Sequence, residues 1–76
     1  MTTQTEKVLR HIQEHGSITS LEAVMVLGIT RLSARIWELE RAGWIISKTW
    51  EEHTNVEGQT SRYLRYSLGE FADTLN

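Results

Sequence analysis

The sequence predicts an α+β domain in which three short helices are followed by a two-stranded β-hairpin. Glycines at positions 16, 28, 43, 58 and 69 divide the chain, and each is expected at the boundary of an element. Apolar residues recur at helical spacing before residue 43 and alternate with polar residues after it. The 76 residues, 39% hydrophobic and without cysteine, suit one domain stabilised by packing.

The first helix is expected over residues 4–15. Val8 and Ile12 lie four residues apart, so that both face one side of a helix. Thr3, with a glutamate three residues later, has the pattern of a capping box. Gly16 is placed where a left-handed residue ends a helix.

The second and third helices are expected over residues 20–27 and 31–42. Thr19, also followed three residues later by a glutamate, is expected to cap the second helix, and Gly28 to end it. Thr30 is expected to cap the third helix. This short connection predicts a tight helix-turn-helix. The side chains expected to face the core are those of Ala23, Val24, Leu27, Ile29, Leu32, Ile36 and Leu39.

Beyond residue 43 the apolar period becomes two, which predicts the hairpin. Strands are expected over residues 44–50 and 63–68, because apolar and polar side chains alternate in both. The polar segment 51–61 is expected to be the loop between them. Residues 1–69 would then form the domain, and residues 70–76 a flexible C-terminal tail.

Three helices followed by a hairpin are the order of a winged helix-turn-helix, in which the hairpin is the wing. Residues 17–46 also resemble the small winged helix-turn-helix proteins common in bacteriophages and prophages. The most specific part of the resemblance is Arg35-Ile36, Glu38-Leu39 and Gly43. It implies a DNA-binding or regulatory domain. Ile36 and Leu39 depart from the register of repressor-type helix-turn-helix proteins, which favours the winged class.

The solvent-facing side of the third helix is expected to contact DNA. Thr30, Arg31 and Ser33 lie at its N-terminal end, the part that approaches base edges and phosphates in a major groove. Arg41, near the other end, is expected to contact a phosphate.

Arg35 lies at the margin of the core-facing side of this helix. Two interpretations remain open: a contact to DNA, or a structural ion pair with Glu22 or Glu38. A helical wheel at 100° per residue places Glu38 on the outward side.

In the hairpin, the candidate phosphate contacts are Lys48, Gln59, Arg62 and Arg65, because a wing along the DNA backbone needs flexible cations and amides. Three glutamates in the predicted loop oppose them. A solvated surface loop explains the same mixture of charges.

Three apolar side chains are candidates for a protein interface. Trp37 either leans against the hairpin and covers the core, or anchors a protein partner. Met25 and Val26 point away from the predicted buried set, so they either cover the first helix or form a dimer patch.

We find no constellation of residues for catalysis, so the protein is not expected to be an enzyme, and no cofactor is expected. His11 and His15 share a helix face but have no obvious third metal ligand, and they are expected to be a surface pair. No apolar run approaches the roughly 20 residues that a membrane helix needs. These features predict a cytoplasmic protein without membrane contact.

The sequence therefore predicts a regulator of transcription, or an architectural factor, that binds double-stranded DNA as a homodimer. The alternative is a winged-helix module that binds a host protein and does not depend on DNA. The net charge of −2 and Trp37 favour the alternative, whereas the resemblance and the arginines of the third helix favour DNA.

Overall fold

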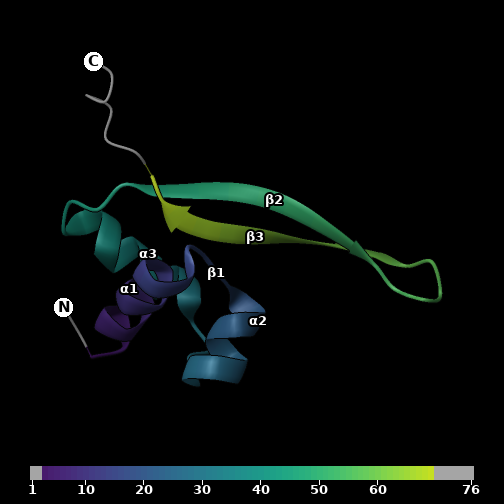
Figure 1. Cartoon of the computed structure of the whole chain (residues 1–76), viewed down its shortest axis with the longest axis horizontal. Coiled ribbons are helices and arrows are strands. Elements are labelled where there is room, and N and C mark those ends of the chain that lie inside the picture. Colours follow the sequence, from purple (N-terminus) through teal and green to yellow (C-terminus); the bar gives the residue numbers. More distant parts are fainter. Residues whose placement is uncertain (1–2, 70–76) are drawn as a thin grey trace, which may run out of the picture.

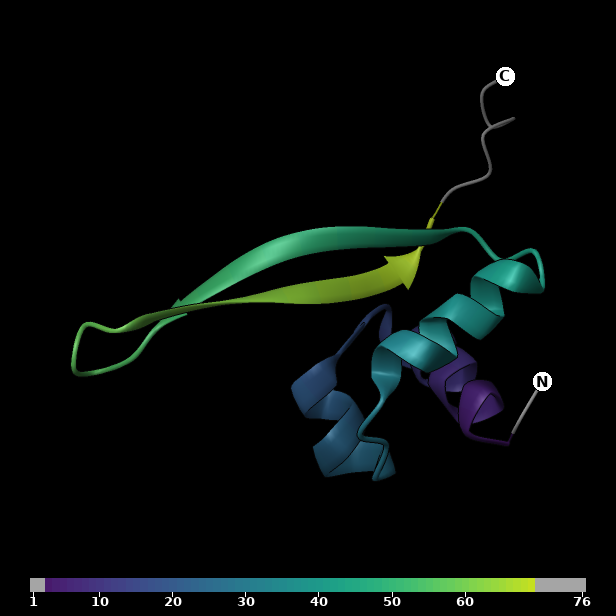
Figure 2. The same ribbon diagram turned by 180° about the vertical axis from the view of Figure 1, so that it is seen from behind.

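The helices lie against one end of a three-stranded antiparallel sheet in the computed structural model, which describes residues 3–69 (Figures 1 and 2). The elements are α1 (Thr3–His15), β1 (Ile18–Thr19), α2 (Ser20–Glu22), η1 (Ala23–Leu27), α3 (Leu32–Arg41), β2 (Ile46–Thr54) and β3 (Thr60–Leu68). The α+β class and the order of helices before the hairpin are confirmed. The predicted tail, residues 70–76, lies outside the described residues.

The core joins all the helices to the base of the sheet. Its buried apolar side chains are those of Val8, Ile12, Ile18, Ala23, Ile29, Leu32, Ile36, Leu39 and Tyr66. Because α1 and α3 contribute residues at helical spacing, they present continuous apolar faces to one another. This packing fixes the direction of α3, whose opposite face remains in solvent.

The second helix changes from α to π geometry within its eight residues. The predicted capping box is confirmed: the Thr19 Oγ1 accepts from the Glu22 backbone N–H at 3.2 Å, and Glu22 accepts from the Thr19 N–H at 3.1 Å. From residue 23 the helix is π-helical, so the wheel at 100° per residue no longer applies. For this reason the prediction that Val24 is buried is wrong, and its side chain is exposed.

The turn between η1 and α3 needs a left-handed residue. Gly28 supplies it, with φ of 71°, a conformation that costs other residues free energy. The Ile29 N–H then bonds to the Ala23 carbonyl at 2.9 Å and turns the chain toward the core. The prediction that Thr30 caps α3 is wrong: Arg31 is the N-cap residue and makes no side-chain capping bond.

The sheet contains one strand more than the predicted hairpin. Its order is β1-β3-β2, and Ile18 of β1 pairs with Tyr66 of β3. A strand of two residues is too short to show an alternating pattern, which explains why it was not predicted. The first strand of the hairpin was predicted to begin at residue 44, two residues too early. In the structure β2 begins at Ile46, and the Trp44 N–H bonds instead to the Leu39 carbonyl at the end of α3.

The wing is longer than predicted and projects beyond the helices (Figures 1 and 2). The interpretation of residues 51–61 as a loop is wrong, because both strands continue through polar residues to the pair Thr54 and Thr60. Only residues 55–59 connect them. Backbone pairing stabilises these strands without an apolar face, so hydrophobic alternation could not reveal them.

Candidate nucleic-acid interface

The outward face of α3 carries the side chains predicted to contact bases and phosphates. Thr30, Arg31 and Ser33 are exposed around its N-terminus. Among residues 3–69, Arg31 makes no ion pair, and it is exposed to solvent. The beginning of α3 can thus offer a cation and two hydroxyls to one ligand.

Trp37 and Arg41 form a stack one helical turn apart on α3. The Arg41 guanidinium carbon lies 4.8 Å from the centre of the Trp37 ring, within the range of a cation–π contact. Trp37 is 55% exposed, so the interpretation in which it covers the core is wrong. The tryptophan that packs against the core is Trp44.

The wing has two faces, and only one of them turns toward α3. In the antiparallel register Lys48 lies opposite Tyr66, and Glu52 opposite Arg62. Side chains of directly opposed residues share a face, so Lys48 and Arg62 lie on the same side as the core residue Tyr66. The Lys48 Nζ lies 3.2 Å from a carboxylate oxygen of Glu40 on α3, which joins this face of the wing to the helix.

Arg62 extends the same face toward the tip of the wing. Its guanidinium carbon lies 4.9 Å from the centre of the Trp50 ring, and its Nε lies 4.0 Å from a carboxylate oxygen of Glu52. The wing therefore repeats the arginine–tryptophan stack seen on α3. Neither Trp50 nor Glu40 was predicted to belong to this surface, although even-numbered spacing from Lys48 along the strand places Trp50 beside it.

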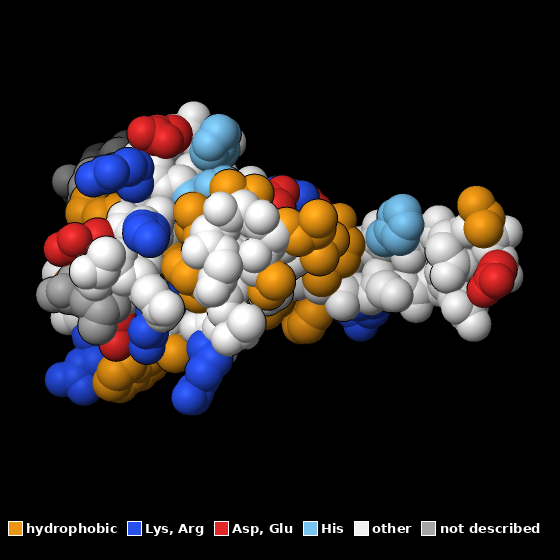
Figure 3. Space-filling view, turned by 90° about the horizontal axis from the view of Figure 1, so that it is seen from below, with side chains coloured by type: hydrophobic (Ala, Val, Ile, Leu, Met, Phe, Trp, Pro, Cys, Tyr) orange, Lys and Arg blue, Asp and Glu red, His pale blue; other side chains and the backbone are white. Residues whose placement is uncertain are grey.

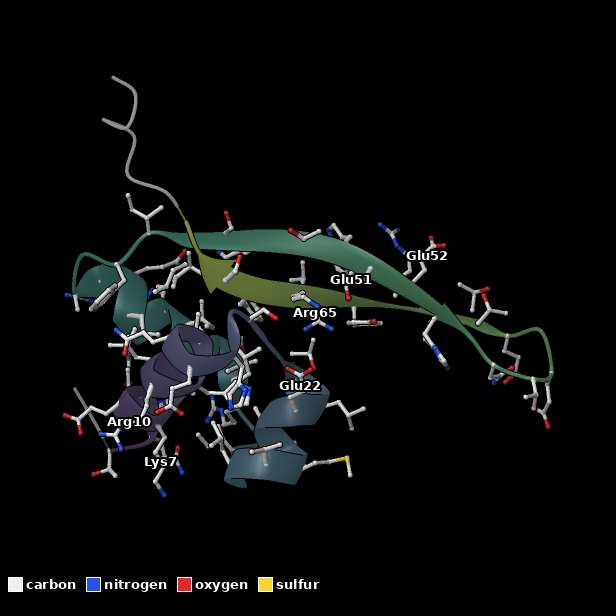
Figure 4. The ribbon with its side chains drawn as sticks, viewed as in Figure 1. Lys7, Arg10, Glu22, Glu51, Glu52 and Arg65 are labelled. Carbon is white, nitrogen blue, oxygen red and sulfur yellow. The ribbon has the colours of Figure 1, made fainter. Side chains whose placement is uncertain are left out.

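Arg65 lies on the other face of the wing, apart from Lys48 and Arg62. Its Nε donates to Glu51 at 2.9 Å, and one Nη donates to the Ser17 hydroxyl at 2.9 Å and lies 3.5 Å from Glu22. Figure 4 shows Glu51, Arg65 and Glu22 converging from β2, β3 and α2, whereas Glu52 lies farther along the wing. Arg62 and Arg65 are three residues apart, and that odd spacing already places them on opposite faces of a strand.

The ion pair with Glu51 shifts the pKa of each group in the direction that favours its charged form. The hydrogen bond from Arg65 lowers the pKa of the Glu51 carboxyl below its ordinary value, against the opposing effect of burial. The same bond raises the pKa of Arg65. Arg65 therefore holds the wing against α2, and its charge is partly satisfied within the protein.

Arg35 forms a structural ion pair with Glu38, one of the two glutamates considered as its partner. The two side chains approach to 3.3 Å, and Arg35 also donates to the Gln4 Oε1 at 3.1 Å. Glu38 also accepts a hydrogen bond from the buried Thr5 hydroxyl. Glu38 therefore faces α1, and its predicted outward placement is wrong.

The remaining wing candidate, Gln59, lies in the loop at the tip. Its side-chain oxygen accepts from the Asn55 amide at 3.2 Å. The Asn55 oxygen in turn accepts from the N–H groups of Glu57 and Gln59 at 2.9 and 3.0 Å. These bonds order the tip and leave Gln59 exposed.

The two histidines of α1 are not the surface pair that was predicted. Their rings lie 4.5 Å apart, as a shared face requires, but His11 is only 8% exposed and its Nε2 lies 3.9 Å from Glu22. Within residues 3–69, no group of three or more histidine, cysteine, aspartate or glutamate side chains is arranged to hold a metal ion.

The exposed side of α3 and the face of the wing that turns toward this helix together carry more positive than negative charge. Their cations are Arg31, Arg41, Lys48 and Arg62, and their carboxylates are Glu40 and Glu52, each beside one wing cation. These surfaces can bind phosphates through Arg31 and Arg41 directly. At the wing, a phosphate would have to compete with a carboxylate.

Comparison with known proteins agrees with this architecture. The model of the winged helix-turn-helix domain family matches residues 3–71. No curated protein and no solved structure matches the chain. No helix within residues 3–69 has the length and apolar character needed to cross a membrane. Since the family model covers nearly the whole sequence, the chain belongs to the winged helix-turn-helix domain family.

Proposed function

We propose that this protein binds double-stranded DNA, with α3 in the major groove and the wing along the sugar–phosphate backbone. The observation that carries the proposal is the exposed position of Arg31 and Arg41 on α3, together with Lys48 and Arg62 on the face of the wing that turns toward this helix. Helices of this kind contact base edges through their N-terminal residues, which here are Thr30, Arg31 and Ser33.

Arg35 and Arg65 have a different part in this proposal. Both are half-buried and bonded to carboxylates, so they position α3 and the wing and do not supply the main phosphate contacts. Gln59, at the exposed tip, is free to reach a more distant phosphate.

The biological role that fits this binding mode is a small cytoplasmic regulator of transcription or an architectural factor. Its resemblance to phage and prophage proteins supports a role in a mobile element. A single copy offers few phosphate contacts, so we expect micromolar non-specific affinity. Two copies on adjacent half-sites would provide the affinity of a specific complex.

The test is fluorescence anisotropy with a labelled random-sequence duplex at about 50 and 200 mM salt. Neutralising three to five phosphates gives a slope of about −3 to −4.5 for log K against log salt. Arg31→Ala and Arg62→Ala should each weaken binding and reduce the slope by about 1. Lys7→Ala removes the same charge from α1 and should leave both quantities unchanged.

Two results would contradict the proposal. One is a wild-type protein that is folded but does not bind the duplex at the lower salt concentration. The other is an affinity that falls equally in all three variants, because binding would then follow net charge and not this face. In the first case the alternative role as a protein-interaction module would take its place.

A further inference from the structure

The outer face of the second helix exposes a contiguous group of apolar side chains. Leu21, Val24, Met25 and Val26 are all exposed, with Met25 75% and Val26 63% accessible. In Figure 3 hydrophobic side chains gather over this part of the helical body, with the wing extending to one side. Contiguous apolar surface of this kind is typical of interaction sites.

Three members of this face lie in η1, between Ala23 and Leu27, which both pack toward the core. Val24, Met25 and Val26 are consecutive, so they point in different directions around the part of η1 that faces away from Ala23 and Leu27. Here Ala23 is buried and all three residues after it are exposed. Insertions of π geometry in α-helices are frequent at functional sites.

A cationic groove borders the apolar face on the side of α1. The groove has a volume of about 320 Å³; α1 contributes Lys7, Arg10 and Glu14, and η1 contributes Val26 and Leu27. Within residues 3–69, neither Lys7 nor Arg10 forms an ion pair. Figure 4 shows both side chains on α1, on the side away from the wing.

We propose that this face binds an amphipathic helical segment of a protein partner whose apolar stripe is bordered by carboxylates. The stripe would cover Leu21, Met25 and Val26, and the carboxylates would pair with Lys7 and Arg10. Helix-in-groove recognition combines apolar anchors with charges at the rim in this way. The proposal does not rest on DNA binding. The cations of this site belong to α1, which lies on the opposite side of the molecule from α3, as the front and back views show (Figures 1 and 2).

The same charges disfavour a second copy of this chain as the occupant. A two-fold symmetric contact places each surface against itself. Every copy would then bring two groove cations, Lys7 and Arg10, and one groove carboxylate, Glu14. The excess positive charge of the two copies would be repulsive in such a contact. An acidic partner would neutralise it.

The experiment uses two labelled helical peptides and fluorescence anisotropy. Both carry leucines at positions i, i+3, i+4 and i+7, flanked by glutamates in one peptide and by lysines in the other. The wild-type protein should bind the glutamate peptide at least about tenfold more tightly. Met25→Ser should weaken that binding about tenfold, since a large apolar side chain is lost from the contact.

Charge reversal distinguishes this site from non-specific adsorption. Lys7→Glu combined with Arg10→Glu should reverse the preference, so that the lysine peptide binds more tightly. Arg62→Glu, a reversal on the wing, should leave the preference as in the wild type. Circular dichroism establishes that each variant is folded, and duplex binding by Met25→Ser should equal that of the wild type.

Three outcomes would overturn the proposal. The first is that the folded wild-type protein binds neither peptide or binds both equally. The second is that the doubly reversed variant keeps the wild-type preference. The third is a wild-type dimer in sedimentation equilibrium that Met25→Ser converts to monomer, because the occupant would then be a second copy. Failure of duplex binding leaves these measurements unaffected, so the two proposals are tested separately.

Discussion

Arg65 connects the wing to the segment around β1 and α2, which is more than forty residues earlier in the sequence. It bonds to Ser17 before β1 and to Glu51 in β2, and it lies beside Glu22 at the end of α2. An arginine can do this because its planar guanidinium offers five donors in fixed directions. Arg65 therefore helps to fix the orientation of the wing relative to the helices, a role that needs no contact with DNA.

Glu51→Gln should reduce the loss of unfolding free energy that occurs when the pH is lowered into the acid range. The pKa of Glu51 is lowered in the folded state, so its stabilising effect is complete above its unfolded pKa of about 4.3 and is lost as pH falls through the lower folded value. Thermal denaturation should show wild type more stable than Glu51→Gln at pH 7, with the difference shrinking below about pH 4. Glu57→Gln, on the wing loop, is the control and should show no such trend; an unchanging difference for Glu51→Gln would contradict the prediction.

Trp37→Ala should leave the fold nearly as stable as the wild type, because the ring is mostly exposed and contacts Arg41. Trp44→Ala is the matched comparison, since that ring packs against the core. It should cost roughly 2–3 kcal/mol of unfolding free energy, less than a fully buried tryptophan. Urea denaturation of both variants measures the difference, and equal destabilisation would show that Trp37 has a packing role.

Among the elements, α1 and α3 were predictable and the wing only in part. The helices bury apolar residues at regular spacing, and their expected bounds of 4–15 and 31–42 agree closely with the structure. The outer wing has no buried face, so no hydrophobic period marks its strands. The placement of Arg62 and Arg65 on opposite faces of the wing could have been predicted from the sequence, because it follows from the periodicity of a strand that includes both residues.

A partner of Arg35 could be predicted from the sequence, whereas the partners of Arg65 could not. The partner of Arg35 was one of two named carboxylates, both near enough in the predicted fold to reach it. The partners of Arg65 depend on the register between β2 and β3 and on the pairing of β1. Register is a tertiary property that polar strands specify weakly, so these partners could not be chosen from the sequence.

The turn between η1 and α3 should be sensitive to substitution of its glycine. Gly28→Ala places a Cβ on a residue with φ of 71°, which costs about 1 kcal/mol. Gly28→Asn should cost less, since asparagine tolerates the left-handed region better. No other heavy atom lies within 4 Å of the position that the new Cβ would occupy, so backbone strain is the only cause. Chemical denaturation should rank wild type above asparagine and asparagine above alanine; the reverse ranking would contradict this account of the turn.

For the molecule as a whole, the distribution of charge matters more for DNA binding than the net charge does. The net charge of −2 does not favour DNA, but the charges are distributed unevenly. Arg31 and Arg41 face solvent on α3, whereas the charge of Arg65 is offset inside the wing junction by two carboxylates, those of Glu51 and Glu22. The field at the α3 face is therefore set by local arrangement more than by overall composition, and it should be screened strongly by salt.

A chain that ends at Gly69 should retain the melting temperature of the full chain. Every buried apolar side chain of the described core lies between Val8 and Tyr66, and the last bond of the sheet region runs from the Gly69 N–H to the Ile45 carbonyl. Removing residues 70–76 therefore leaves these contacts in place. The measurement is differential scanning calorimetry of both chains at equal concentration. In a domain of this size 1 kcal/mol corresponds to roughly 4–8 °C, so a loss of more than about 4 °C would mean that Phe71 or Leu75 contributes to the core.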